Sequence, residues 1–275
     1  MKDQLLKALV LNEHVRLYIV RTTDLVQEAQ DRFDLHPCAC AALGRTLSVA
    51  SMMGAMLKSE EEMLSITING HGPIGSIVVD AYANGNVRGF VSNPHVEDVL
   101  IRPGKLNVGA VVGTDGTLTV TKDLSMEENF SGSVELQSGE IGDDFSYYFA
   151  VSEQTPSVVS VGVLVNDTNE VLASGGFIIQ LLPEATEEDI TYIENAVKQC
   201  PPVSQLINEG KTPEDILRSL FDDVEITETQ DLFFITERIT RYKDMKTPAR
   251  LKNAVKSGVF EACPSSILYP INAKT

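Results

Sequence analysis

The chain has 275 residues and a formal net charge of -17, with 43% hydrophobic and 22% charged residues. This composition excludes global disorder and provides enough apolar side chains for a sizeable core. The acidic balance argues against nucleic acid and anionic membrane surfaces as partners, and no apolar run reaches the ~18 residues that span a bilayer. We expect no signal peptide, and four cysteines are too few for a secreted disulfide scaffold, so a reducing cytoplasm is the expected location.

The N-terminal third of the chain predicts two helices followed by strands. Thr22 to Asp24 supply capping residues for a helix over 25–33, and His36-Pro37 opens a longer helix that reaches about residue 58. Small residues in that second helix permit close packing. After residue 63 the apolar period changes from helical to alternating, and turn signals divide the chain into short segments. The predicted strands cover 64–68, 74–81, 86–92, 117–122 and 131–137.

The next stretch predicts one more helix and a long hairpin. The helix covers 143–152, and two apolar strands over 158–165 and 171–181 are joined by a short loop. Strands joined by short turns pair antiparallel. Because the helices are grouped apart from the strands, we expect an α+β fold with a largely antiparallel sheet packed against helices.

The composition changes at Pro183. The segment 183–231 has thirteen acidic and three basic residues, whereas 232–275 has three acidic and eight basic ones. The pattern predicts short amphipathic helices after the capping residues Thr186 and Thr212, and such helices need a surface to pack against. We therefore divide the chain into a core domain (1–182), an acidic helical linker (183–231) and a basic tail (232–275). The apolar linker positions are Ile190, Ile193, Val197, Ile216, Leu217 and Leu220.

Several short motifs do not carry the chemistry that they resemble. The glycines of 70–75 have dinucleotide-loop spacing, but the residues that follow favour a strand, so we interpret them as a turn. Cys38 and Cys40 point ~200° apart on a helix, which suits buried packing better than a shared metal. No nucleophile elbow and no ATP-binding phosphate loop occurs. We therefore predict no enzymatic activity and no bound cofactor.

Methionines are concentrated near the end of the second predicted helix. Met52, Met53, Met56 and Met63 are four of the seven in the chain. Flexible, polarizable methionine suits an adaptable binding surface, but it also fills ordinary cores. Both interpretations hold if this helix lies under a removable cover.

Eight segments, taken in chain order, carry a family resemblance over about residues 1–225. They are AALGRT (41–46), MGAMLK (53–58), GPIG (72–75), GKL (104–106), VGTDGTL (112–118), SGEIGDDF (138–145), SEQTPS (152–157) and GGFIIQ (175–180). Together they resemble the 33-kilodalton heat-shock holdase family, the redox-regulated chaperones of bacteria. The resemblance implies an α+β core, a helical linker and a small C-terminal domain.

The tail departs from the family pattern. In the family, four thiolates arranged as Cys-x-Cys and Cys-x-x-Cys bind zinc. At the corresponding offsets this chain has Ile235 and Glu237, followed by Cys263 and Ser266. No cysteine lies between Cys200 and Cys263, so we expect neither bound zinc nor a thiol switch. Without zinc, this tail must fold through apolar packing, pack against the acidic linker or stay disordered.

The resemblance implies an ATP-independent holdase that binds unfolded proteins and prevents their aggregation. We expect clients to meet an apolar core surface that includes Met52, Met53 and Met56 and is covered by the linker positions named above. Activity is predicted not to require oxidation, and a homodimer is left open. The alternative is a regulatory or binding module that has kept the fold without chaperone activity.

Overall fold

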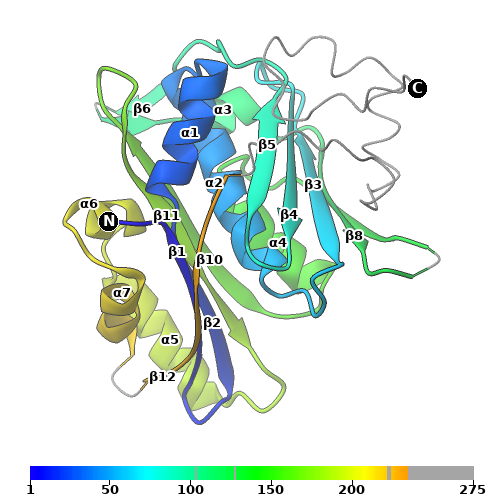
Figure 1. The fold of residues 1–275 in the computed structure, drawn as a ribbon, viewed down its shortest axis with the longest axis vertical. Helices are drawn as coiled ribbons and strands as arrows, with labels where there is room; N and C mark the ends of the chain where they lie inside the picture. Colours follow the sequence, from blue (N-terminus) through cyan, green and yellow to red (C-terminus); the bar gives the residue numbers. More distant parts are fainter. Residues whose placement is uncertain (103, 127, 222–223, 235–275) are drawn as a thin grey trace.

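The computed structural model describes residues 1–102, 104–126, 128–221 and 224–234. Within them the chain forms two five-stranded antiparallel sheets with helices between and outside them (Figure 1). The α+β class predicted from the sequence is confirmed. Positions 235, 237, 263 and 266, which correspond to the family's zinc ligands, lie outside the described residues.

The first sheet, here called sheet A, has the strand order β10-β11-β2-β1-β12. Every neighbouring pair is antiparallel. The first hairpin was not predicted from the sequence, and its turn has positive φ at Leu11, Asn12 and Glu13. The strands are β1 (Gln4–Val10), β2 (Val15–Arg21), β10 (Ser157–Val165), β11 (Val171–Leu181) and β12 (Val224–Asp231).

The second sheet, sheet B, has the order β5-β4-β3-β8-β9 and contains all five strands predicted between residues 63 and 137. A small hairpin beside it, β6 (Leu100–Arg102) and β7 (Lys105–Leu106), was not predicted. The strands of sheet B are β3 (Met63–Asn69), β4 (Ser76–Tyr82), β5 (Val87–Val91), β8 (Thr117–Asp123) and β9 (Phe130–Glu135).

Helix α2 (Pro37–Gly54) packs between the two sheets, against β10 and β11 on one side and β4 and β5 on the other (Figure 1). Sixteen of its eighteen residues are buried. Its small residues permit this, since a Cβ on Gly44 would lie 2.8 Å from the side chains of Val26 and Val163. The other core helices are α1 (Thr23–Phe33), α3 (Val108–Val112) and α4 (Gly142–Val151).

The acidic linker contains helices α5 (Glu187–Gln199), α6 (Val203–Asn208) and α7 (Pro213–Leu220). The expectation that the whole segment 183–231 is helical is wrong at its end, where β12 pairs with β1 along the edge of sheet A. The reason is a period of two in which Val224 and Ile226 are half-buried against apolar neighbours while Thr227 is exposed.

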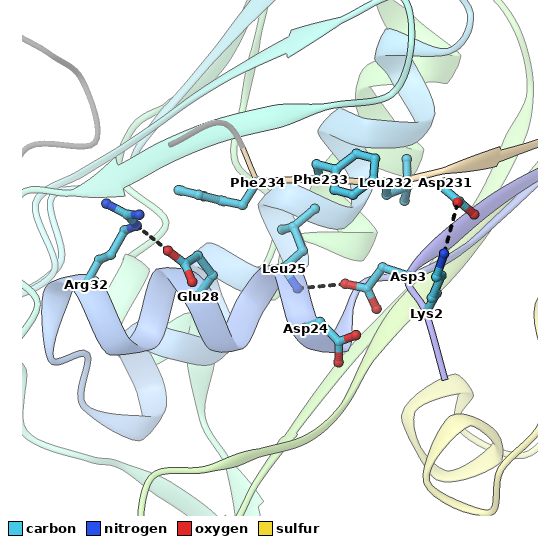
Figure 2. Close-up of a pocket in the computed structure, with 10 residues that line it drawn as sticks. All are labelled: Lys2, Asp3, Asp24, Leu25, Glu28, Arg32, Asp231, Leu232, Phe233 and Phe234. Atoms are coloured by element: carbon cyan, nitrogen blue, oxygen red, sulfur yellow. Dashed lines mark hydrogen bonds and ion pairs between the residues drawn. The ribbon is translucent and has the colours of Figure 1, made fainter. Parts of the chain in front are cut away.

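Asp3 joins the N-terminus to three other parts of the core. Its carboxylate accepts a hydrogen bond from Arg21 Nη1 at 2.5 Å. It accepts another from the Leu25 backbone N–H at 2.6 Å (Figure 2). Its backbone carbonyl accepts from the N–H of Leu232, just after β12, at 3.0 Å. Burial raises the pKa of Asp3 to about 6, although the backbone N–H of Leu25 and the charge of Arg21 oppose that shift.

The raised pKa of Asp3 gives a pH-dependent stability with a defined sign. The folded chain holds this proton more tightly than the unfolded chain, so stability falls as pH rises from about 4 to about 6. We expect Asp3→Asn to remove up to about 3 kcal/mol of that fall, measured by urea unfolding between pH 4 and pH 7. The control is Glu28→Gln, which removes a negative charge from α1 at an exposed side chain that pairs with Arg32 rather than with Arg21. An unchanged pH profile in Asp3→Asn would contradict the assignment.

Candidate functional site

Sheet A is apolar on both faces. Along β1 and β2 the side chains alternate, so Leu5 and Val20 join the core around α2 whereas Leu6, Leu17 and Ile19 point to the opposite side. Every one of these side chains is buried. Because both faces are apolar, the outer face of sheet A also needs a covering layer. Its other members are Ala8, Val10, Val15, Ala173, Phe177 and Ile179.

The linker helices α5, α6 and α7 supply that layer, here called the helical cover (Figure 1). Of the linker residues predicted to face the core, Ile193, Ile216, Leu217 and Leu220 are buried against the outer face. Val197 is half-buried in the same cluster. Ile190 is half-buried and lies outside it. Phe221, predicted from the sequence as part of the apolar face of α7, is buried there too. Sequence reasoning missed the contribution of α6, which is Val203, Leu206 and Ile207.

Few polar contacts hold the helical cover in place. Helices α5 and α7 begin with the predicted capping boxes, Thr186 with Asp189 and Thr212 with Asp215. Asp189 also contacts His14 Nδ1 in the β1–β2 hairpin at 2.9 Å, which ties the start of the cover to sheet A. These carboxylates mostly order the helix starts, and only Asp189 reaches across to the sheet.

Hydrogen bonding keeps both capping carboxylates ionised. The backbone N–H of Thr186 and the ring of His14 lower the pKa of Asp189, and the backbone N–H of Thr212 lowers the pKa of Asp215. Negative charge at a helix N-terminus is also favourable because of the helix dipole. The caps therefore remain intact at neutral pH.

An aromatic pair connects the first and last helices of the cover. Tyr192 of α5 stacks on Phe221 with ring centroids 5.7 Å apart, and its hydroxyl donates to the Leu220 carbonyl at 3.3 Å. Tyr192 is 37% exposed, whereas Phe221 is buried. The stack therefore links α5 to the end of α7.

The methionine cluster does not lie under the helical cover. Met52 and Met53 are buried in the core around α2, on the opposite side of sheet A from α5–α7. Met56 is half-buried and borders a cavity of about 190 Å³ that Lys122 and Glu153 also line. The idea of a methionine surface under the linker is therefore wrong, because α2 is enclosed by the two sheets.

The three described cysteines are packed rather than grouped. Cys38 and Cys40 are buried on α2, and Cys38 Sγ lies 3.6 Å from the carbonyl of Val99. Burial raises the pKa of Cys40 to about 12, so this thiol is neutral at physiological pH. In the part of the chain that the structure describes, no three His, Cys, Asp or Glu side chains are placed to hold a metal ion.

None of the helices in the described segments is both long and apolar enough to cross a membrane.

Comparison with known proteins gives a consistent result. A family model described as Hsp33 protein matches residues 3–237. The 33 kDa chaperonin of Bacillus mycoides is 56% identical over 236 residues, which are 85% of this chain and 81% of that relative. The 33 kDa chaperonin of Bacillus cytotoxicus is 54% identical over the same shares of both chains.

A solved structure has the same fold. The crystal structure of the 33 kDa chaperonin (Hsp33 homologue) from Thermotoga maritima aligns with a TM-score of 0.79 at 33% identity. The alignment covers 94% of this chain and 90% of that chain. With the family model spanning most of the sequence and close relatives aligned over 85% of it, this chain belongs to the Hsp33 family of chaperones.

Proposed function

We propose that this chain is an ATP-independent holdase that binds unfolding proteins on the outer face of sheet A. The observation that carries the proposal is a continuous apolar sheet face whose described covering layer is three short helices and the residues around them. An extended apolar surface binds unfolded chains without sequence preference, since burial of apolar area is non-directional.

The helical cover has the properties of a removable layer. Helices of six and eight residues, such as α6 and α7, are not stable in water without packing. In α5, Ile193 alone is fully buried. The cover can therefore open at a lower free energy than the core, where α2 is enclosed on both sides.

Net charge supports the same role. A chain with a charge of -17 repels its copies, which keeps a client-loaded complex soluble. Membership of a family of chaperones supports the same proposal. We place its action in the cytoplasm, as expected from the sequence.

Control by zinc and thiols is not part of the proposal. Four thiolates are needed for the family's zinc site, and the chain has no cysteine from residue 201 to residue 262. Ile235 and Glu237 occupy the first pair of ligand positions. In the second pair, Cys263 has a serine rather than a cysteine as its partner at position 266. One thiolate neither holds a structural zinc nor forms the paired disulfides that release it. We infer that heat or spontaneous opening of the cover replaces oxidation.

The first test compares reduced and oxidised protein. We expect the untreated, reduced chain to suppress light scattering from a heat-denatured client, with no further gain after peroxide. The control is a protein of similar size and charge without the sheet. Suppression that appears only after peroxide would contradict the redox-independent part, and no suppression in either state would favour a binding module that lacks chaperone activity.

The second test loosens the cover. Leu217 is fully buried, so Leu217→Ala should destabilise the closed cover by about 2–4 kcal/mol. We expect amides of α5–α7 to exchange faster than those of α2 in the wild type, and faster still in the variant, and client suppression to begin at a lower temperature. Arg218→Ala, one residue further and exposed, is the matched control. Equal exchange rates in the cover and in α2 would show that the cover opens only when the core unfolds.

The third test concerns metal. A structural zinc site contributes ~10–16 kcal/mol of apparent binding free energy, so its removal would unfold or destabilise a small domain. We expect a chelator to leave both the melting temperature and client suppression unchanged, and metal analysis to find well below one zinc per chain. One tightly held equivalent after exhaustive dialysis would overturn this expectation.

A further inference from the structure

A groove runs along β10, which is an outer strand of sheet A. It has a volume of about 850 Å³ and borders the helical cover, because residues of α6 line it. β10 lies along the groove, α6 forms one wall, and α2 with the β6–β7 hairpin forms the other. The residues that line it are Arg45, Arg102, Gly104, Lys105, Leu106, 160–165, 202–205 and Asn208.

The outward backbone groups of β10 are unpaired in the groove. The N–H of Val159 points away from β11, because it donates to Ser146 Oγ of α4 at 3.2 Å. With the strand period of two, the backbone groups of Val161 and Val163 also point away from β11. Within the described chain neither residue has a hydrogen-bond partner on that side. An unpaired strand edge is a template for another strand.

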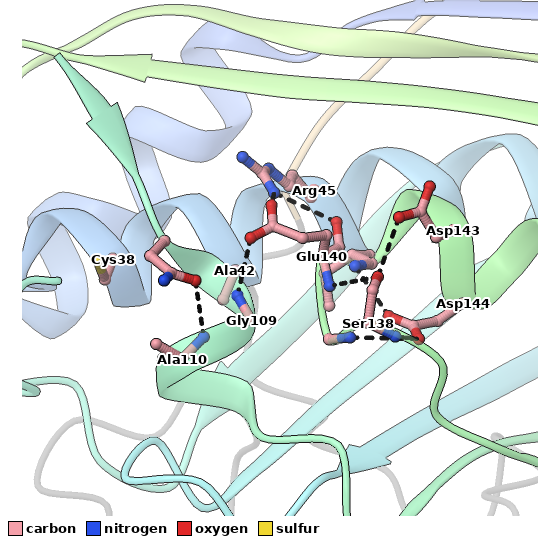
Figure 3. A network of polar contacts seen from close by, with 12 residues as sticks. Cys38, Ala42, Arg45, Gly109, Ala110, Ser138, Glu140, Asp143 and Asp144 are labelled. Atoms are coloured by element: carbon pink, nitrogen blue, oxygen red, sulfur yellow. Dashed lines mark hydrogen bonds and ion pairs between the residues drawn. The ribbon is translucent and has the colours of Figure 1, made fainter. Parts of the chain in front are cut away.

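Walls on both sides of β10 favour one extended segment over the edge of a folded protein. On the cover side, α6 approaches so closely that a Cβ on Gly162 would lie 2.8 Å from Ser204 Oγ. On the core side, Arg45 is fixed by an ion pair with Glu140 at 2.7 Å, and Glu140 also accepts from the N–H of Gly109 at 3.0 Å (Figure 3). A strand that pairs with β10 must therefore enter as a single chain.

The charged side chains that line the groove indicate which kind of segment binds there. The ionisable side chains that line the groove are Arg45, Arg102 and Lys105, all cationic, in a protein whose net charge is -17. Glu140 forms an ion pair with Arg45. Burial raises the pKa of Glu140, but hydrogen bonds and the charges of Arg45 and Lys105 lower it below its ordinary value. One carboxylate thus faces these cations, and in the described part of the chain neither Arg102 nor Lys105 forms an ion pair of its own within 4 Å. The chain's own tail, 232–275, has a net charge of +5 from eight basic and three acidic residues, so it is disfavoured there. An extended segment that carries carboxylates fits best.

We propose that the β10 edge binds an extended, acidic segment of an unfolded client as an added strand, with backbone hydrogen bonds to Val161 and Val163 and carboxylates beside Arg102 and Lys105. This inference rests on the proposed holdase function and adds a second client site. The groove exists while the cover is closed, so it can hold a client before the outer face of sheet A is exposed. Strand addition recognises backbone, as a holdase with many clients requires.

The test uses the full chain and a labelled, end-blocked heptapeptide that alternates valine and glutamate. Below the temperature of cover opening, we expect a rise in fluorescence anisotropy and slower hydrogen exchange at the Val161 and Val163 amides. A peptide N-methylated at alternate amides, on the side that would face β10, should bind about tenfold more weakly or not at all. A version with lysine in place of glutamate should weaken by a similar factor.

Variants of the protein, rather than of the peptide, test the same site. Lys105→Glu should weaken binding of the glutamate peptide about tenfold, while Lys58→Glu, an exposed charge reversal outside the groove, should not. Val161→Pro removes one outward N–H and should also weaken binding. If Val161→Pro does not fold, the N-methylated peptide still decides the point. Equal binding of the methylated peptide, or protection confined to other strands, would overturn the proposal.

The outcome separates this inference from the proposed function. A wild-type chain that suppresses client aggregation but does not bind the peptide at β10 keeps its holdase role and loses the second site. A chain that binds the peptide at β10 but never suppresses aggregation keeps the strand-addition site as a general peptide site. In that case the holdase proposal fails, and so does the proposal that the bound segment belongs to an unfolded client.

Discussion

Sheet A is apolar on both faces, and the architecture follows from the need to cover each of them. On one face α2 fills the space up to sheet B, and small residues such as Gly44 allow that close approach. On the other face the described layer consists of short linker helices. The two layers differ in stability because α2 is enclosed on two sides, whereas each cover helix packs on one face and is exposed on the other. This asymmetry is what the proposed function uses, since it distinguishes the enclosed core from the layer proposed to open.

A chaperone function follows from that asymmetry without catalysis or ATP. In the family, zinc and thiols decide when the apolar face becomes available, but this chain lacks the first thiol pair. In the described part of the chain, the cover is held on sheet A by packing of residues such as Leu217 and Phe221, and by the contact of Asp189 with His14. Under the proposed function, temperature rather than oxidation weakens this packing. The β10 groove would add a site that is available while the cover is closed, since α6 of the cover forms one of its walls.

The sequence pattern predicted most of the fold but less of the site. The five strands of sheet B were predicted because they alternate and end at turn signals, and α2 because small and apolar residues recur at helical spacing. The β1–β2 hairpin was missed although Leu6, Leu17 and Ile19 mark one apolar face. Acidic composition concealed β12, where Val224 and Ile226 alternate with polar residues. Short alternating runs are weak signals until a neighbouring strand pairs with them.

By itself the sequence determined the α+β class, the capped linker helices, the charge division and the missing cysteine pair, because each depends on local spacing or on composition. Only the tertiary structure decided that Met52 and Met53 lie inside the core, and that the linker covers the opposite face of sheet A. It also decided that β10 is an edge strand with unpaired backbone groups. These features depend on which strands pair, and pairing joins residues as distant as Gln4 and Asp231, which no local pattern encodes.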